Sequence, residues 1–196
     1  MTSQPAALAE TKPICAGLLP MPSPRRVTDR PATWYGFGAS WQEHIERGLI
    51  RRHPGQVSAT NVDRGVFLRG GTRLRVYDHT GLYVPGRNDL IPVRVEFHER
   101  PTYPTWGLAP KHYPRVFADP GAASAHRMPA DDALCLYHPD DPAERRWTAT
   151  DGLVSLFNIV VNHLFCELRW RNTGGSDGGV WPLDEAPHGF VAKEAS

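Results

Sequence analysis

One cysteine of this chain stands in a setting where its sulfur could act as a nucleophile. Cys135 lies between apolar residues in the run ALCLY, which predicts a backbone held against packed structure. A polar loop follows it and supplies His138, Asp140 and Asp141. An imidazole close to a thiol can lower the thiol pKa or serve as a base, and a carboxylate can hold or accept a proton. These residue types therefore indicate nucleophilic chemistry at Cys135.

The same residues have simpler structural explanations, and the sequence alone leaves them open. A cysteine between apolar neighbours is often a small core residue. An imidazole in a polar loop, such as that of His138, is often only solvated. The two aspartates precede Pro142 and can form a turn without taking part in any reaction.

A zinc site is a second chemistry that the sequence can support. Cys135 and His138 form a C-x-x-H pair, and His163 and Cys166 form an H-x-x-C pair further along the chain. Two such pairs can supply the ligands of a tetrahedral zinc ion. The second pair falls in an apolar helical segment, where its charge would be buried. A zinc-structured binding protein is therefore an alternative to a cysteine nucleophile.

The segment after the cysteine predicts the helix that supports the site. Trp147 is expected to anchor the end of the polar loop in the core. Thr148 or Thr150 can cap the helix, and Asp151 in the first turn favours its start. Apolar residues between 153 and 168 then cover most of the circumference, which predicts a helix buried on more than one side. Polar side chains interrupt this run, so we do not expect it to cross a membrane.

The chain before the cysteine predicts a helix and then short strands. Ser40 and Glu43 have the spacing of a capping box, which indicates an amphipathic helix of about three turns that ends before Pro54. Strands are indicated at Val66–Leu68, Leu74–Tyr77, Ile91–Phe97 and Arg115–Phe117, with a turn around Gly81. No helix-length crossover separates them, so they should form an antiparallel meander of about four strands. The sequence therefore predicts an α+β fold.

Composition and charge narrow the class of protein. Among 196 residues, 22 are Lys or Arg and 21 are Asp or Glu, so the net charge of +1 gives no reason to expect nucleic acid or an anionic membrane as a partner. Three widely spaced cysteines favour a reducing, cytoplasmic setting. Residues 1–33 are expected to be a flexible arm, and residues 34–196 a single domain with a Gly-rich C-terminal extension. The sequence contains no Walker-type phosphate loop, and we expect no cofactor.

Taken in order, these features resemble the ubiquitin-conjugating enzyme fold over roughly Ser40 to Arg171. Members of that family have an aromatic-Pro segment after the third strand, a catalytic cysteine in an (I/L)-C-L context and a Trp-(Ser/Thr) pair that opens the next helix. The matching residues here are Tyr103-Pro104, Leu134-Cys135-Leu136 and Trp147-Thr148. The family's His-Pro-Asn triplet before the cysteine is replaced by His126-Arg127-Met128-Pro129, so the asparagine credited with stabilising the oxyanion is missing.

The resemblance implies a chemistry for the candidate residues. Cys135 would accept an acyl group as a thioester and present it to an amine. His126 would order the loop, as the family's histidine does. His138 would act as a base or lower the thiol pKa. Asp140 and Asp141 would hold the incoming ammonium or take its proton.

The resemblance also implies partners. The Cys-Leu-Tyr context and the C-terminal residues look more like the bacterial ubiquitin-conjugating-like proteins of anti-phage operons, which include the cyclic-oligonucleotide-based signalling systems (CBASS). The acyl donor would then be the C-terminus of a ubiquitin-like protein or of a cGAS-like nucleotidyltransferase, with or without an activating enzyme. Because the asparagine is missing, a non-catalytic scaffold of the same fold is a further alternative.

Overall fold

The structure is a computed structural model that describes Trp34 and residues 39–64, 72–138, 141–142, 144 and 146–182. All of these residues belong to the compact unit that spans residues 32–196. The predicted flexible arm over residues 1–33 lies outside the described residues. The Gly-rich C-terminal extension is described only as far as residue 182.

Two short helices open the described part, in place of the single helix predicted there. Helix α1 spans Ser40–Glu46 and α2 spans Leu49–Arg52. The predicted cap at Ser40 is wrong, because Ser40 is already helical and the preceding residue makes no side-chain capping bond. The helix breaks because Gly48 adopts a left-handed conformation with φ of 76°. This conformation costs glycine little, and it turns the chain so that Ile45 and Leu49 are both buried.

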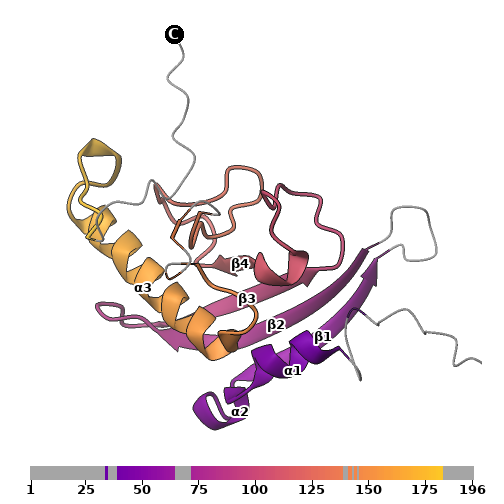
Figure 1. Ribbon diagram of the computed structural model, residues 1–196. Coiled ribbons are helices and arrows are strands. Elements are labelled where there is room, and N and C mark those ends of the chain that lie inside the picture. The colour runs from indigo at the N-terminus through magenta and orange to yellow at the C-terminus, as the bar shows by residue number, and fades with distance from the viewer. Residues whose placement is uncertain are drawn as a thin grey trace, which may run out of the picture. The chain divides into compact units, whose positions relative to one another are not determined.

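The sheet has four antiparallel strands in the order β1-β2-β3-β4 (Figure 1). They are β1 at Val57–Arg64, β2 at Thr72–Tyr83, β3 at Leu90–His98 and β4 at Arg115–Ala118. Together with a long helix near the C-terminus, this arrangement confirms the predicted α+β class and the antiparallel meander. The alternation predicted around β3 is also confirmed, since Val93, Val95 and Phe97 are buried and face the core.

Two strand predictions differ from the structure. The strand expected at Val66–Leu68 lies outside the described residues, and β1 has no counterpart among the predicted strands. The turn expected around Gly81 is wrong, because β2 continues through this residue with an irregularity between His79 and Leu82. A Cβ atom at Gly81 would lie 2.6 Å from the Cβ of Leu90 on β3. Glycine is therefore required here by the close approach of the neighbouring strand.

Helix α3, Gly152–Asn172, packs across one face of the sheet and encloses the main core (Figure 1). Its start differs from the predicted one. Asp151 is the N-cap residue without a capping side-chain bond, and its carboxylate accepts bonds from the N–H and hydroxyl of Thr148 instead. Trp147 is buried, as predicted, and its Nε1–H donates to the Gly152 carbonyl over 2.9 Å. The apolar set of α3 is mostly covered, although Phe165 is exposed.

The chain between β4 and α3 lacks a long regular element among its described residues, and this stretch contains Cys135. An isolated antiparallel bridge joins Arg127 to Leu134, and the Leu134 N–H donates to the Val116 carbonyl on β4 over 2.8 Å. The cysteine segment is therefore attached to the edge of the sheet by backbone hydrogen bonds. Among the described helices, none is long and apolar enough to cross a membrane.

Candidate functional site

Cys135 is fixed by its backbone and almost fully covered. Its N–H donates to the His126 carbonyl over 3.0 Å, and the side chain is only 3% exposed. Met128 N–H donates to the Ala133 carbonyl over 2.7 Å, so residues 126–135 form a narrow hairpin-like segment. We call residues 126–135 the flap. The flap places the candidate nucleophile at the junction of β4 and the core.

His126 and Cys135 are brought together through the backbone. The imidazole of His126 packs against Trp181, with ring centroids 4.0 Å apart, and against His163 on α3, at 6.4 Å. The structural contribution of His126 to the cysteine is thus its carbonyl oxygen, which accepts the Cys135 N–H. This contact orders the loop, while the catalytic part of the prediction for His126 stays a prediction.

His138 and Asp141 lie in a closed turn after the cysteine. The Asp141 carboxylate accepts the His138 N–H over 2.8 Å, and the Asp141 N–H donates to the His138 carbonyl over 3.0 Å. Asp141 is buried, and the His138 ring lies 5.8 Å from that of Trp106. This geometry fits the turn explanation for Asp141, because one carboxylate oxygen is engaged by the backbone. Asp140, the other predicted carboxylate, lies outside the described residues.

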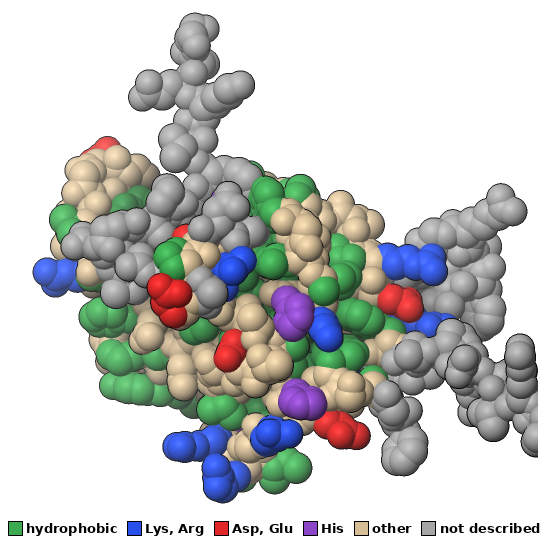
Figure 2. Space-filling view, in the orientation of Figure 1, with side chains coloured by type: hydrophobic (Ala, Val, Ile, Leu, Met, Phe, Trp, Pro, Cys, Tyr) green, Lys and Arg blue, Asp and Glu red, His purple; other side chains and the backbone are tan. Residues whose placement is uncertain are grey.

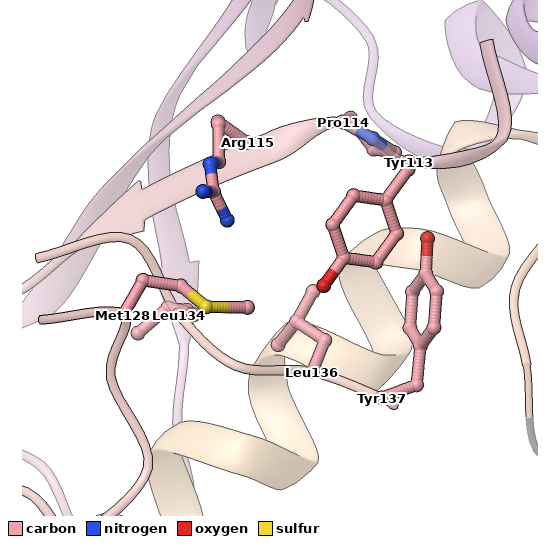
Figure 3. Close-up of a pocket in the computed structure, with 7 residues that line it drawn as sticks. All are labelled: Tyr113, Pro114, Arg115, Met128, Leu134, Leu136 and Tyr137. Atoms are coloured by element: carbon pink, nitrogen blue, oxygen red, sulfur yellow. The ribbon is translucent and has the colours of Figure 1, made fainter. Parts of the chain in front are cut away.

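A small pocket lies beside the cysteine segment. It has a volume of about 10 Å³, which is close to the smallest space that holds one water-sized group. Seven residues from β4 and its approach, the flap and the strand-like run after it line this pocket, and Figure 3 shows them: Tyr113, Pro114, Arg115, Met128, Leu134, Leu136 and Tyr137. We call it the Arg115 pocket.

Three tyrosines gather around this region, and their hydroxyls differ in their surroundings. Tyr137 donates to the His112 carbonyl over 2.7 Å, and Tyr103 donates to the Tyr113 carbonyl over 3.2 Å. Tyr113 lines the Arg115 pocket itself. Burial raises the pKa of Tyr113 well above its ordinary value, and the thiol of Cys135 raises it further. The Tyr113 phenol therefore stays protonated at neutral pH.

Arg115 brings a buried positive charge to the pocket. The residue is 4% exposed, and its guanidinium carbon lies 3.9 Å from the centroid of the Tyr103 ring. Its Nε lies 3.1 Å from Asp131 Oδ2, although this nitrogen has no hydrogen bond of good geometry. Reasoning from the sequence assigns no site role to Arg115 or to the Tyr113 side chain. The sequence does contain a signal for both residues, because the Tyr113-Pro114 pair is followed directly by an arginine at the start of a short predicted strand.

A buried ion cluster fastens the flap to α3. Arg127 Nε and Nη2 donate to the two oxygens of Glu167, each over 3.1 Å, and Glu167 is fully buried. Arg171 Nη1 and His163 Nε2 also lie 3.4 Å from this carboxylate. Burial raises the pKa of Glu167, but the neighbouring His163 and Arg127 outweigh it and lower the value to about 2. Glu167 is therefore ionised across the neutral range.

One face of the molecule carries charges of both signs. On the face drawn in Figure 2, acidic and basic side chains are interspersed, and basic ones gather at the lower end around α1 and α2. Arg47, Arg51 and Arg52 are exposed there. This face therefore presents charges of both signs, apart from the basic group around α1 and α2.

The zinc alternative has no set of ligands in the described part of the chain. No group of three or more His, Cys, Asp or Glu side chains lies close enough there to hold a metal ion. His163 instead faces Glu167, Trp181 and His126. The predicted pairing of Cys135 and His138 with His163 and Cys166 is therefore not formed.

Comparison of the chain with models of known families, with curated proteins and with solved structures finds no match. Inferences about function therefore rest on the fold and on the residues around Cys135.

Proposed function

We propose that this chain is an acyltransferase of the ubiquitin-conjugating type, in which Cys135 carries an acyl group as a thioester. The observation that supports this most is the position of Cys135. It follows a four-stranded antiparallel meander and precedes Trp147 and the long helix α3, in the order that the family resemblance implies. The cysteine is also held by backbone bonds, and its chain neighbours Leu134 and Leu136 line a pocket that contains a buried cation. A fixed nucleophile with a polar pocket suits acyl transfer.

The proposed reaction has two steps. The Cys135 thiolate attacks the carbonyl carbon of the donor, a tetrahedral oxyanion forms, and the donor's leaving group departs with the electrons of the broken bond. An amine then attacks the thioester carbonyl, the C–S bond breaks, and Cys135 leaves as a thiolate. The ammonium proton of the attacking amine passes to a base or to solvent. Because the thiolate leaves readily, the protein mainly has to orient the amine.

The donor in this proposal is a protein C-terminus, as the resemblance to bacterial anti-phage proteins implies. It would belong to a ubiquitin-like protein or a cGAS-like nucleotidyltransferase in the cytoplasm. His138 is the imidazole placed after the cysteine, where it can assist deprotonation of the amine. Asp141 supports the turn that carries this histidine.

A small thioester tests the proposal without knowledge of the natural donor. Parent protein, Cys135→Ala and Cys166→Ala are incubated with N-acetylglycine thiophenyl ester, and acylation is followed by intact mass and peptide mapping. We expect the parent and Cys166→Ala to be acylated at residue 135 and then to transfer the group to free lysine. Cys166 is the matched control because it is equally buried, at 2% exposure. Equal acylation of Cys135→Ala, or a thioester that lysine attacks no faster than a model thioester in solution, contradicts the mechanism.

A non-catalytic scaffold of the same fold is the second candidate, and the burial of Cys135 favours it. A thiol that is 3% exposed has to be uncovered before it can react. The same protein samples decide between the two candidates. A Cys135 that reacts with iodoacetamide no faster than a model thiol, and accepts no acyl group, supports the scaffold.

A further inference from the structure

A second pocket is lined by residues from the turn after α2, from β2 and β3, and from α3. It has a volume of about 310 Å³, at the lower end of the range of about 300–1,000 Å³ for small-molecule sites. Among the described residues that line it, none is Asp, Glu, Lys or Arg, and none is a candidate residue for the chemistry of Cys135. We call it the His53 pocket.

The His53 pocket has apolar walls on α3 and on both strands. Phe157 on α3 is buried, and its ring packs edge-on against the rings of His53 and His79, with centroids 5.4 and 5.1 Å away. Tyr83 and Leu90 are cross-strand partners that also line the pocket, and they are 66% and 61% exposed. Apolar side chains exposed at the edge of a pocket are typical of a binding site.

Hydrogen bonds fix which nitrogens of the two histidines carry a hydrogen. The Gly81 N–H donates to His79 Nδ1 over 3.0 Å, so this nitrogen carries no hydrogen. Burial and the nearby imidazole of His53 lower the pKa of His79 to about 4, so its ring is neutral at pH 7. The hydrogen of this ring is therefore on Nε2, which lies 3.0 Å from His53 Nδ1 and donates to it. His53 in turn carries its own hydrogen on Nε2.

This chain of bonds has one direction, because the Gly81 N–H can only donate. A hydrogen on His53 Nδ1 would face the hydrogen on His79 Nε2, so His53 cannot act as a base while the chain is intact. A metal ion shared by the two facing nitrogens would need a hydrogen on His79 Nδ1, where it would oppose the Gly81 N–H. The Nε2–H of His53 is thus a fixed neutral donor on a side chain that lines the pocket.

We propose that the His53 pocket binds a small neutral molecule that has an apolar body and a carbonyl or similar oxygen, which accepts a hydrogen bond from His53 Nε2. The uncharged lining offers a carboxylate or an ammonium no opposite charge, and burying an unpaired charge is costly. The exposed amide side chains of Gln56 and Asn158 also line the pocket, and they can bond further polar atoms of such a ligand. This binding function is separate from acyl transfer and does not depend on Cys135.

Histidine NMR and a neutral probe test the inference on the full chain. The probe is N-benzylacetamide, which joins a phenyl ring to an amide carbonyl. Toluene has the ring without the acceptor, and 3-phenylpropionate has a carboxylate in place of the amide. His53→Phe keeps a ring beside Phe157 and removes the donor. His98→Phe is the matched control, because His98 packs against Tyr103 and is not part of the pocket lining.

Long-range proton–nitrogen spectra of the parent should show the hydrogen of both His53 and His79 on Nε2. N-benzylacetamide should bind saturably and shift the His53 Nε2 resonance, with 3-phenylpropionate at least about tenfold weaker. His53→Phe should weaken binding of N-benzylacetamide about five- to tenfold and leave toluene binding unchanged within about twofold. His98→Phe should bind both like the parent.

The inference is overturned by a hydrogen on His79 Nδ1, by N-benzylacetamide binding that does not saturate, or by equal binding of 3-phenylpropionate. It is also overturned if His53→Phe weakens toluene and amide binding equally. The spectra and titrations of the parent decide the matter even if a variant fails to fold.

Discussion

The buried carboxylate of Glu167 should be one of the main stabilising groups that join the flap to α3, and Glu167→Gln tests this. Glutamine keeps the shape of the side chain and mimics the protonated acid, so its cost follows from the shift in the Glu167 pKa. That pKa falls from its ordinary value of 4.5 to about 2. The difference corresponds to roughly 3 kcal/mol of stability at pH 7. Breaking a buried ion pair from one side costs a similar amount, about 3–5 kcal/mol.

The pH dependence gives the prediction its sharper form. A depressed carboxyl pKa stabilises the fold above the unfolded value, and this contribution is lost as the pH falls from about 4.5 to about 2. The deficit of Glu167→Gln should therefore shrink from roughly 3 kcal/mol at pH 7 to roughly 1 kcal/mol at pH 3. Urea unfolding followed by tryptophan fluorescence at both pH values measures it.

An exposed ion pair provides the control for Glu167. Asp78 and Arg94 form a pair on the outer surface of the sheet, with N–O distance 2.7 Å and both side chains well exposed. Asp78→Asn should cost less than about 1 kcal/mol. If Glu167→Gln costs no more than Asp78→Asn at pH 7, or if its deficit is the same at pH 3, the reasoning about the buried cluster is refuted.

Three further predictions concern the fold that carries the site, each checked by chemical or thermal unfolding. Gly81→Ala should cost about 1–3 kcal/mol, because the new Cβ would lie 2.6 Å from that of Leu90; a neutral effect would show that the strands separate easily. Trp147→Phe should cost about 2–3 kcal/mol through lost volume and the lost bond to Gly152, and a cost below about 1 kcal/mol would contradict this. Burial and a neighbouring imidazole lower the pKa of His79 to about 4, so the unfolded chain, with an ordinary value of 6.5, binds the proton first. Stability is then lost between about pH 6.5 and 4, and His79→Gln should lose less over that range; an unchanged slope would disprove the assignment.

The sequence predicts this fold well where burial repeats along the chain. The alternation in β3 reflects the burial of one face of the strand, and the dense apolar residues of α3 reflect burial on more than one side of the helix. The structure confirms both elements. The errors at Ser40 and Gly81 have another origin. A serine followed by a glutamate, or a glycine after a strand, has several local explanations. Only the contact with Leu90 explains the glycine, and that contact lies outside its own segment.

The site is less predictable because its charged groups are paired by residues far apart in the chain. Arg115 has the pattern of a surface residue in a short strand until Tyr103 and Asp131 cover it. Glu167 has the pattern of a polar interruption in an apolar helix until Arg127, forty residues earlier, reaches it. Local context alone is enough to single out Cys135, but its near-complete burial depends on segments that this context does not contain.

Burial of Cys135 requires part of the protein to move before the sulfur is exposed, and Glu167→Gln separates two routes. The flap is fixed to β4 by the Arg115–Asp131 pair and to α3 by the Arg127–Glu167 pair, so its displacement is costly. Rotation of the flexible Met128 side chain beside the pocket is much cheaper.

We therefore expect iodoacetamide to alkylate Cys135 at the same rate in Glu167→Gln and in the parent, within about threefold, under conditions where both are folded. If the sulfur were reached only by release of the flap, the loss of roughly 3 kcal/mol would raise the rate about 100-fold. Such an acceleration would mean that the native fold shields the thiol. It would favour the scaffold over the acyltransferase, because an enzyme cannot depend on partial unfolding at its nucleophile for each turnover and still hold the acyl group in one geometry.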